Sequence, residues 1–114
     1  MKKQPLRAFW IFILGFTVLN NIVFAQAKEE INEDECTFNG IRLFGKIQFV
    51  ESFPDLTVKV VESFPDLEVK IVNSFPDECG EWQIVDSFPD LKVKIVESFA
   101  DIKIKFVESF PGIP

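Results

Sequence analysis

Apolar and polar residues alternate in short stretches through the second half of the chain. Residues 56–60 (Leu-Thr-Val-Lys-Val), 91–95 (Leu-Lys-Val-Lys-Ile) and 102–106 (Ile-Lys-Ile-Lys-Phe) all follow this pattern. A period of two is typical of a strand with one buried face, and Val, Ile and Phe favour strands. No stretch after residue 27 sustains a helical period. The pattern therefore predicts an all-β fold built from short strands.

Each alternating stretch ends in two adjacent apolar residues. The pairs are Val60-Val61, Ile71-Val72, Ile95-Val96 and Phe106-Val107. Neighbouring side chains point to opposite faces of a strand, so a flat strand cannot bury both on one face. The chain must bend, bulge or pass between two apolar surfaces at each pair. Because the break recurs, we interpret it as a corner of the architecture.

A Ser-Phe dipeptide recurs between the stretches, with steps of 11, 11, 13, 11 and 11 residues. It opens a turn, and the turn residues are Phe53-Pro54-Asp55, Phe64-Pro65-Asp66, Phe75-Pro76-Asp77, Phe88-Pro89-Asp90, Phe99-Ala100-Asp101 and Phe110-Pro111. Proline suits the second position of a type I turn, and the aspartate after it can bond its own backbone. A phenylalanine at a fixed place in every arm predicts an aromatic core. We expect each 11-residue arm to hold one strand and one turn, with these rings buried together.

The single irregular step exposes a duplication. Residues 45–79 align with residues 80–114 without a gap, and 20 of the 35 pairs are identical. The alignment places Trp82 over Ile47, which is a strand position, so Trp82 is expected to be packed. The chain therefore predicts one small domain, made of two copies of a three-arm unit and preceded by the less regular residues 29–44.

Charge constrains how the arms pair. Parallel stacking in exact register would place the lysines of four arms in one row: Lys59, Lys70, Lys94 and Lys105. Like charges directly opposite one another on a sheet are unfavourable. An antiparallel or an offset winding would instead set lysines against glutamates, and the charge pattern favours one of these two.

The N-terminus has the pattern of a secretory signal peptide. Cations precede an apolar run, and a small-x-small cleavage site follows it: Lys2, Lys3 and Arg7, then residues 9–19, then Ala25 and Ala27. We expect a signal helix over residues 1–27, a flexible segment over 28–34 and the folded domain over 35–114. The chain is then exported, to the periplasm or the extracellular space. The alternative is an uncleaved N-terminal membrane anchor, because residues 8–25 reach about the lower length for crossing a bilayer.

Charge also limits the partners. After cleavage the chain would carry nine cationic and eighteen acidic residues, a net charge of −9. Binding to nucleic acid or to an anionic membrane surface needs a basic patch. We therefore expect no nucleic acid and, once the signal segment is cleaved, no membrane. The partner, if there is one, is another envelope or extracellular protein, and the domain itself is expected to be a monomer.

The two cysteines, Cys36 and Cys79, each follow an Asp-Glu pair. An even count in an exported chain favours a disulfide between them. Closing a loop of this length would stabilise the fold by about 4 kcal/mol on the chain-entropy account. Free thiols and an intermolecular bridge are the alternatives.

The composition argues against catalysis. The chain has no His and no Tyr, which removes the commonest general base and the usual metal-binding imidazole. The repeated serines lack a base to activate them. We predict a non-enzymatic structural or binding module with no catalytic residue, metal or cofactor. The alternative is calcium or ligand binding through the turn aspartates, which offer hard oxygen ligands: Asp55, Asp66, Asp77, Asp90 and Asp101.

The repeated Val-Glu-Ser-Phe-Pro-Asp-Leu-x-Val-Lys arms, split by the insert over residues 77–83, resemble the septoil knot domain family. The resemblance covers roughly residues 35–114. It implies a very small, compact β-protein whose backbone is wound into a seven-crossing torus knot. Composition and period alone would not suggest a knot, because chains generally avoid them. The resemblance implies no activity and no functional residues.

Overall fold

The computed structural model describes residues 30–114. The predicted leader, with its cleavage residues Ala25 and Ala27, lies outside them. In the described part of the chain, no helix is long and apolar enough to cross a membrane. The secondary-structure elements of this part are all strands, which confirms the predicted all-β class.

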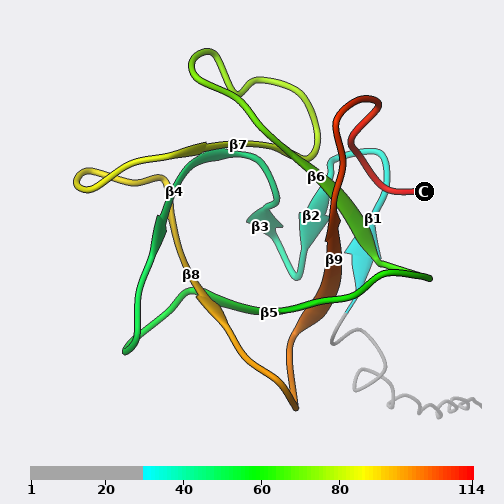
Figure 1. Ribbon diagram of the computed structural model, residues 1–114, viewed down its shortest axis with the longest axis horizontal. Helices are drawn as coiled ribbons and strands as arrows, with labels where there is room; N and C mark the ends of the chain where they lie inside the picture. The colour runs from blue at the N-terminus through cyan, green and yellow to red at the C-terminus, as the bar shows by residue number, and fades with distance from the viewer. Residues whose placement is uncertain (1–29) are drawn as a thin grey trace, which may run out of the picture. The chain divides into compact units, whose positions relative to one another are not determined.

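Six strands form a closed parallel barrel (Figure 1). In chain order they are β4 (Gly45–Phe49), β5 (Leu56–Val60), β6 (Leu67–Ile71), β7 (Glu81–Ile84), β8 (Leu91–Ile95) and β9 (Ile102–Phe106). Their order around the barrel is β4-β7-β6-β9-β5-β8. β5, β6, β8 and β9 each end at the first residue of an apolar pair, where the sequence predicts a corner.

The two sequence copies alternate strictly around this ring. Strands β4, β5 and β6 belong to the first copy and β7, β8 and β9 to the second, and every strand pairs with two strands of the other copy. Consecutive strands are therefore not neighbours, except β6 and β7, where the second copy begins. Each of the other connections between consecutive strands is a return segment. In the ring, one strand of the other copy lies between the two strands that it joins, and the return segment passes outside that strand (Figure 1).

The strands pair with a constant offset. Leu56 pairs with Val93, which is the third residue of its strand rather than the first. When positions are numbered by the alignment of the two copies, in which Gly80 corresponds to Gly45, the same displacement of two residues recurs at each pairing in the barrel. The predicted offset winding is confirmed, and the antiparallel alternative is wrong. The offset does not separate every like charge, because Lys59 still lies opposite Lys103.

Aliphatic side chains and one tryptophan fill the barrel. The buried inward-facing residues are Ile47, Leu56, Val58, Leu67, Val69, Trp82, Leu91, Val93, Ile102 and Ile104. Trp82 is fully buried, as predicted. The last residue of each strand lies at the carboxyl end of the barrel and is 39–46% exposed. We call these the mouth residues: Phe49, Val60, Ile71, Ile84, Ile95 and Phe106.

The predicted phenylalanine core is wrong. The six turn phenylalanines are 80–98% exposed: Phe53, Phe64, Phe75, Phe88, Phe99 and Phe110. The first five lie midway between the end of one strand and the start of the next, and Phe110 holds the same place after the last strand. The 11-residue period fixes the spacing of the rings. It does not fix whether they fall on the inner or the outer part of each arm.

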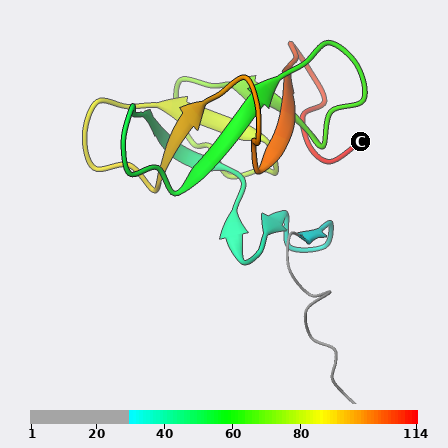
Figure 2. The same cartoon turned by 90° about the horizontal axis from the view of Figure 1, so that it is seen from below.

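A small antiparallel sheet closes the other end of the barrel (Figure 2). It comprises β1 (Ile31–Asn32), β2 (Thr37–Phe38) and β3 (Ile41–Arg42), and we call it the cap. Phe38 and the neighbouring Cys36 and Leu43 are buried in the barrel core. Residues 28–34, predicted to be flexible, thus contain a paired strand, because Ile31 packs against this core. The folded part begins before Glu35.

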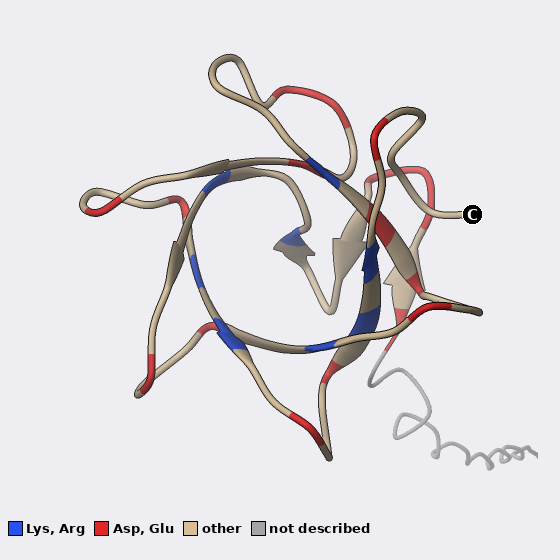
Figure 3. Cartoon of the chain, viewed as in Figure 1, with Lys and Arg blue, Asp and Glu red and all other residues tan. Residues whose placement is uncertain are grey.

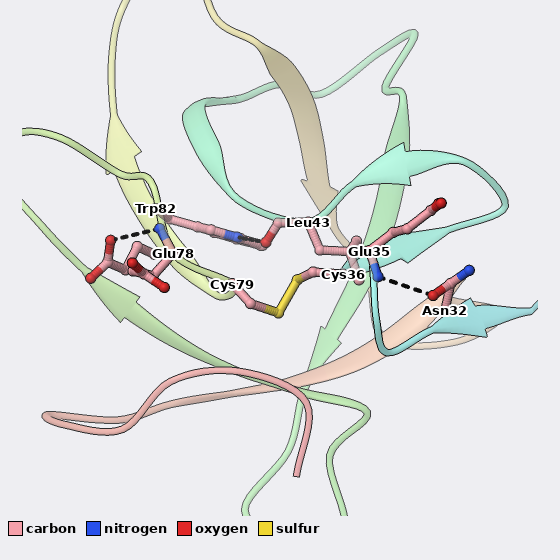
Figure 4. The surroundings of a disulfide bond; sticks show 8 residues. Asn32, Glu35, Cys36, Leu43, Glu78, Cys79 and Trp82 are labelled. Atoms are coloured by element: carbon pink, nitrogen blue, oxygen red, sulfur yellow. Dashed lines mark hydrogen bonds between the residues drawn. A yellow bond between two sulfur atoms is a disulfide. The ribbon is translucent and has the colours of Figure 1, made fainter.

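The predicted disulfide joins the cap to the barrel (Figure 4). Cys36 and Cys79 are bonded, with 5.7 Å between their Cα atoms, and Cys79 lies just before β7. Beside them the indole Nε1 of Trp82 donates a hydrogen bond of 3.0 Å to the carbonyl oxygen of Leu43. The covalent bond and the hydrogen bond together hold the cap at the amino ends of the barrel strands.

Candidate functional site

Six segments project from the barrel, and each carries one of the turn phenylalanines (Figure 1). We call them the spokes: residues 50–55, 61–66, 72–77, 85–90, 96–101 and 107–112. The rings are almost free of contact, from 80% exposure at Phe75 to 98% at Phe99. The spokes point in different directions around the barrel, so they do not gather on one side of it (Figure 1).

The backbone of each spoke phenylalanine is left-handed, with φ between 53° and 57°. Bulky L-residues disfavour this region, at a cost of roughly 1–2 kcal/mol per residue. Glycine would adopt it at least cost. The exposed ring removes almost no apolar surface from water, so it does not offset the backbone cost. The chain therefore carries, at six places, a side chain that stabilises neither the turn nor the core.

The turn aspartates anchor the spokes to neighbouring strands. The Oδ2 atoms of Asp55, Asp66, Asp90 and Asp101 accept hydrogen bonds of 2.8–2.9 Å from the backbone amides of Lys92, Lys103, Lys46 and Thr57 respectively. Each aspartate amide donates in return to the carbonyl oxygen of the same residue. The predicted bond of these aspartates to their own backbone is therefore wrong. Each spoke ends beside a neighbouring parallel strand. Its carboxylate can therefore accept a hydrogen bond from a backbone amide near the amino end of that strand.

Replacing Asp66 with alanine tests this anchoring role. The free energy of unfolding should fall by about 1 kcal/mol, because the amide of Lys103 loses its acceptor. Asp77→Ala is the matched control and should change stability by less than about 0.5 kcal/mol. No hydrogen bond of the Asp77 carboxylate occurs among the described residues. Urea unfolding followed by circular dichroism measures both, and equal losses would contradict the assignment.

Charge is divided between the barrel wall and the spokes (Figure 3). Seven lysines lie on the strands at positions that alternate with the buried residues: Lys46, Lys59, Lys70, Lys92, Lys94, Lys103 and Lys105. None of them forms an ion pair with another residue of the range 30–114. Most acidic residues of this range lie instead on the spokes. The exposed phenylalanines are therefore presented in an acidic setting.

A groove of about 580 Å³ runs between the cap and the barrel. Arg42 lies in it, 5.1 Å from the ring centre of Phe44 and 3.7 Å from the carboxylate of Asp90. The two carboxylates that line it, those of Asp55 and Asp90, already accept hydrogen bonds from strand amides. The groove therefore offers no carboxylate pair that is free of the fold's own hydrogen bonds.

The turn aspartates considered as calcium ligands are not brought together. They lie on separate spokes around the barrel, and four of them bond strand amides. Within residues 30–114, no group of three or more His, Cys, Asp or Glu residues is placed to hold a metal ion.

Comparison with known proteins shows which family has this architecture. The profile of the 7(1) septoil knot domain matches residues 40–114, which include all six barrel strands and all six spokes. The chain belongs to the septoil knot family. The resemblance seen in the repeated arms is thereby confirmed. An uncharacterized protein of Synechocystis sp. is 58% identical over 76 residues, which cover 60% of this chain and 68% of that protein.

For this septoil knot chain, sequence reasoning located the spokes but missed their exposure. The signal was present, because Leu, Val and Ile at the first and third strand positions already supply the core. The phenylalanine lies between Ser and Pro, outside every alternating stretch. A row of lysines is what exact parallel stacking would produce, and the charge pattern disfavours it. The separation of the strand lysines from the acidic spokes depends on which residues leave the barrel, and the sequence pattern does not show this.

Proposed function

We propose that this septoil knot chain is a non-enzymatic, exported module that binds another envelope or extracellular protein through its spoke phenylalanines. One observation carries the proposal: six phenylalanines are almost fully exposed and are held in a costly left-handed conformation. Burying one such side chain in a partner is worth roughly 1.5–3 kcal/mol. Aromatic side chains of this kind are common anchors of protein interfaces.

Other features support export and the absence of catalysis. The leader pattern and the disulfide between Cys36 and Cys79 fit an oxidising compartment. The chain has neither His nor Tyr. The alternative function, calcium binding by the turn aspartates, has no comparable support, since four of these carboxylates serve the fold.

The same proposal includes a knotted backbone, as the description of the family implies. The strict alternation of the two copies supports it, because return segments of one copy pass outside strands of the other. A closed and disulfide-linked winding would hold the spokes in fixed directions. Fixed anchors lose less conformational freedom when a partner binds, and this preserves affinity.

Replacing all six spoke phenylalanines with asparagine tests the proposed function. Asparagine tolerates left-handed backbone, so the variant should fold with equal or higher stability. We expect it to lose the envelope proteins that wild type retains when both are cross-linked in the native envelope and compared by mass spectrometry. A matched control, Ile71→Ser with Ile95→Ser, alters the mouth, where both side chains are 46% exposed, and should retain them. Retention of the same proteins by the six-asparagine variant would contradict the proposal.

A further inference from the structure

We infer that the spokes are separate docking sites for apolar pockets set in a basic surface, so that one chain can hold several partner molecules. This inference rests on the proposed function and deepens it. It adds the chemistry of the partner's pocket and the number of sites. Both follow from the charges beside each ring and from the directions in which the spokes point.

Carboxylates flank the ring on most spokes. An acidic residue lies two positions before Phe53, Phe64, Phe88 and Phe99, and an aspartate lies two positions after each. The preceding acids are all exposed: Glu51, Glu62, Asp86 and Glu97. Two residues of chain span at most about 7 Å, which is within the screening length of physiological salt. A pocket that receives the ring therefore also meets these charges, so a rim of Lys or Arg is attracted and an acidic rim is repelled.

The two remaining spokes are weaker versions of the same site. Phe75 has Asn73 before it and Asp77 after it, and Phe110 has Glu108 before it and Gly112 after it. Each of these rings thus has one flanking carboxylate at these positions instead of two. The chain offers two classes of site, which differ in charge but not in the group that enters the pocket.

The seven lysines on the barrel strands, which we call the wall lysines, limit the contact to the spokes. A groove of about 350 Å³ beside the Phe99 spoke is lined by Lys59 and Lys103 of the strands and by three carboxylates that belong to spokes: Asp66, Glu97 and Asp101. The cations therefore lie on the strands and the carboxylates on the spokes even at this groove, and a basic partner that approached the strands would meet mostly lysines and be repelled. It is attracted only where the acidic spokes project beyond the wall (Figure 3). The partner's pocket therefore receives the tip of a spoke and leaves the barrel uncovered.

The arrangement of the spokes makes the sites independent. They point outward in different directions around a closed ring (Figure 1), so one flat surface cannot cover opposite spokes. Four of them end in an aspartate whose carboxylate accepts a hydrogen bond from a strand amide, so each is held to the barrel separately and covering one does not require another to move. A chain that carries separate sites can join several partner molecules, and its avidity can exceed the affinity of any single site.

The probe for this chemistry is amino-substituted β-cyclodextrin, whose apolar cavity admits a benzene ring and whose rim is cationic. The exported protein, with ¹³C-labelled phenylalanine rings, is titrated and observed by NMR. We expect the rings of Phe53, Phe64 and Phe99 to shift first. The ring of Phe88, whose flanking carboxylate Asp90 lies 3.7 Å from Arg42, should follow at higher concentration with those of Phe75 and Phe110. Neutral β-cyclodextrin should bind roughly three- to tenfold more weakly. The mouth rings, Phe49 and Phe106, are internal controls that should not shift.

Two single variants test independence and charge. Phe99→Asn should remove one site and leave the midpoints of the other rings unchanged. Glu97→Gln should weaken the Phe99 site alone and bring it close to the weaker class. Equal binding of amino-substituted, neutral and carboxymethyl β-cyclodextrin would overturn the basic-pocket chemistry. Saturation at one probe per chain, or changes at other rings in Phe99→Asn, would overturn the separate sites. These outcomes differ from failure of the proposed function, which is retention of envelope proteins by the six-asparagine variant.

Discussion

Peptides 45–79 and 80–114, the two separated copies, are each expected to be unfolded in dilute solution. Every barrel strand pairs only with strands of the other copy, so an isolated copy contains no pair of barrel strands that could hydrogen-bond within one molecule. The far-ultraviolet circular dichroism of each peptide at low micromolar concentration should show no β-sheet. The complete chain, measured beside them, should show a β spectrum and a cooperative melt.

Concentration provides the control for this experiment. The two copies are similar in sequence, with 20 of 35 positions identical, so two molecules of one copy could supply the missing neighbours for each other. Any β signal in a single peptide must then rise with concentration, because it needs a second molecule. A β signal that stays constant on dilution would contradict the alternating arrangement of the copies.

Trp82→Ala is expected to destabilise the complete chain by about 4–6 kcal/mol. Removing a buried Trp costs about 3–5 kcal/mol through lost contacts and the cavity left behind. The carbonyl oxygen of Leu43, which accepts the indole hydrogen bond, also loses its partner, at about 1 kcal/mol more. Domains of this size have total stabilities of about 5–15 kcal/mol. Urea unfolding followed by circular dichroism should therefore show a large shift of the midpoint toward zero urea, equivalent to about 4–6 kcal/mol in the free energy of unfolding.

Phe99→Ala is the matched control for the loss of an aromatic ring. Its side chain is 98% exposed, so the change should alter stability by less than about 0.5 kcal/mol. Trp82→Phe keeps a ring in the core but removes the donor to Leu43, and its loss should lie between the two. A loss below about 1 kcal/mol for Trp82→Ala would show that the cap and barrel do not depend on this contact.

Local features of the fold were predictable because they depend on neighbours in sequence. Alternation located β5, β8 and β9, and the apolar pairs marked their ends. The even cysteine count gave the bond between Cys36 and Cys79. Alignment of the copies placed Trp82 at a core position. Each of these inferences needs only the residue types within an arm or the correspondence between the two copies.

The barrel order and the exposed rings were not predictable in the same way. The arms are so alike that Leu56 meets much the same side chains whichever arm lies beside it, so sequence gives little preference for one pairing. Exposure of a ring such as Phe99 follows from the path of the return segment outside the barrel, not from its hydrophobicity. The aspartate bonds were misassigned for the same reason, because the amide of Lys103 reaches Asp66 only after the ring has closed.

The closure of the ring also restricts how such a chain can change its length. Solenoid proteins tolerate gain or loss of units, because each unit touches only those next to it. Here deletion of residues 56–66 would take β5 from between β8 and β9 and leave a gap flanked by two strands of the same copy. Divergence in this architecture is therefore confined to substitutions within a fixed number of arms. The spokes, which the interior does not constrain, are where such changes cost the fold least.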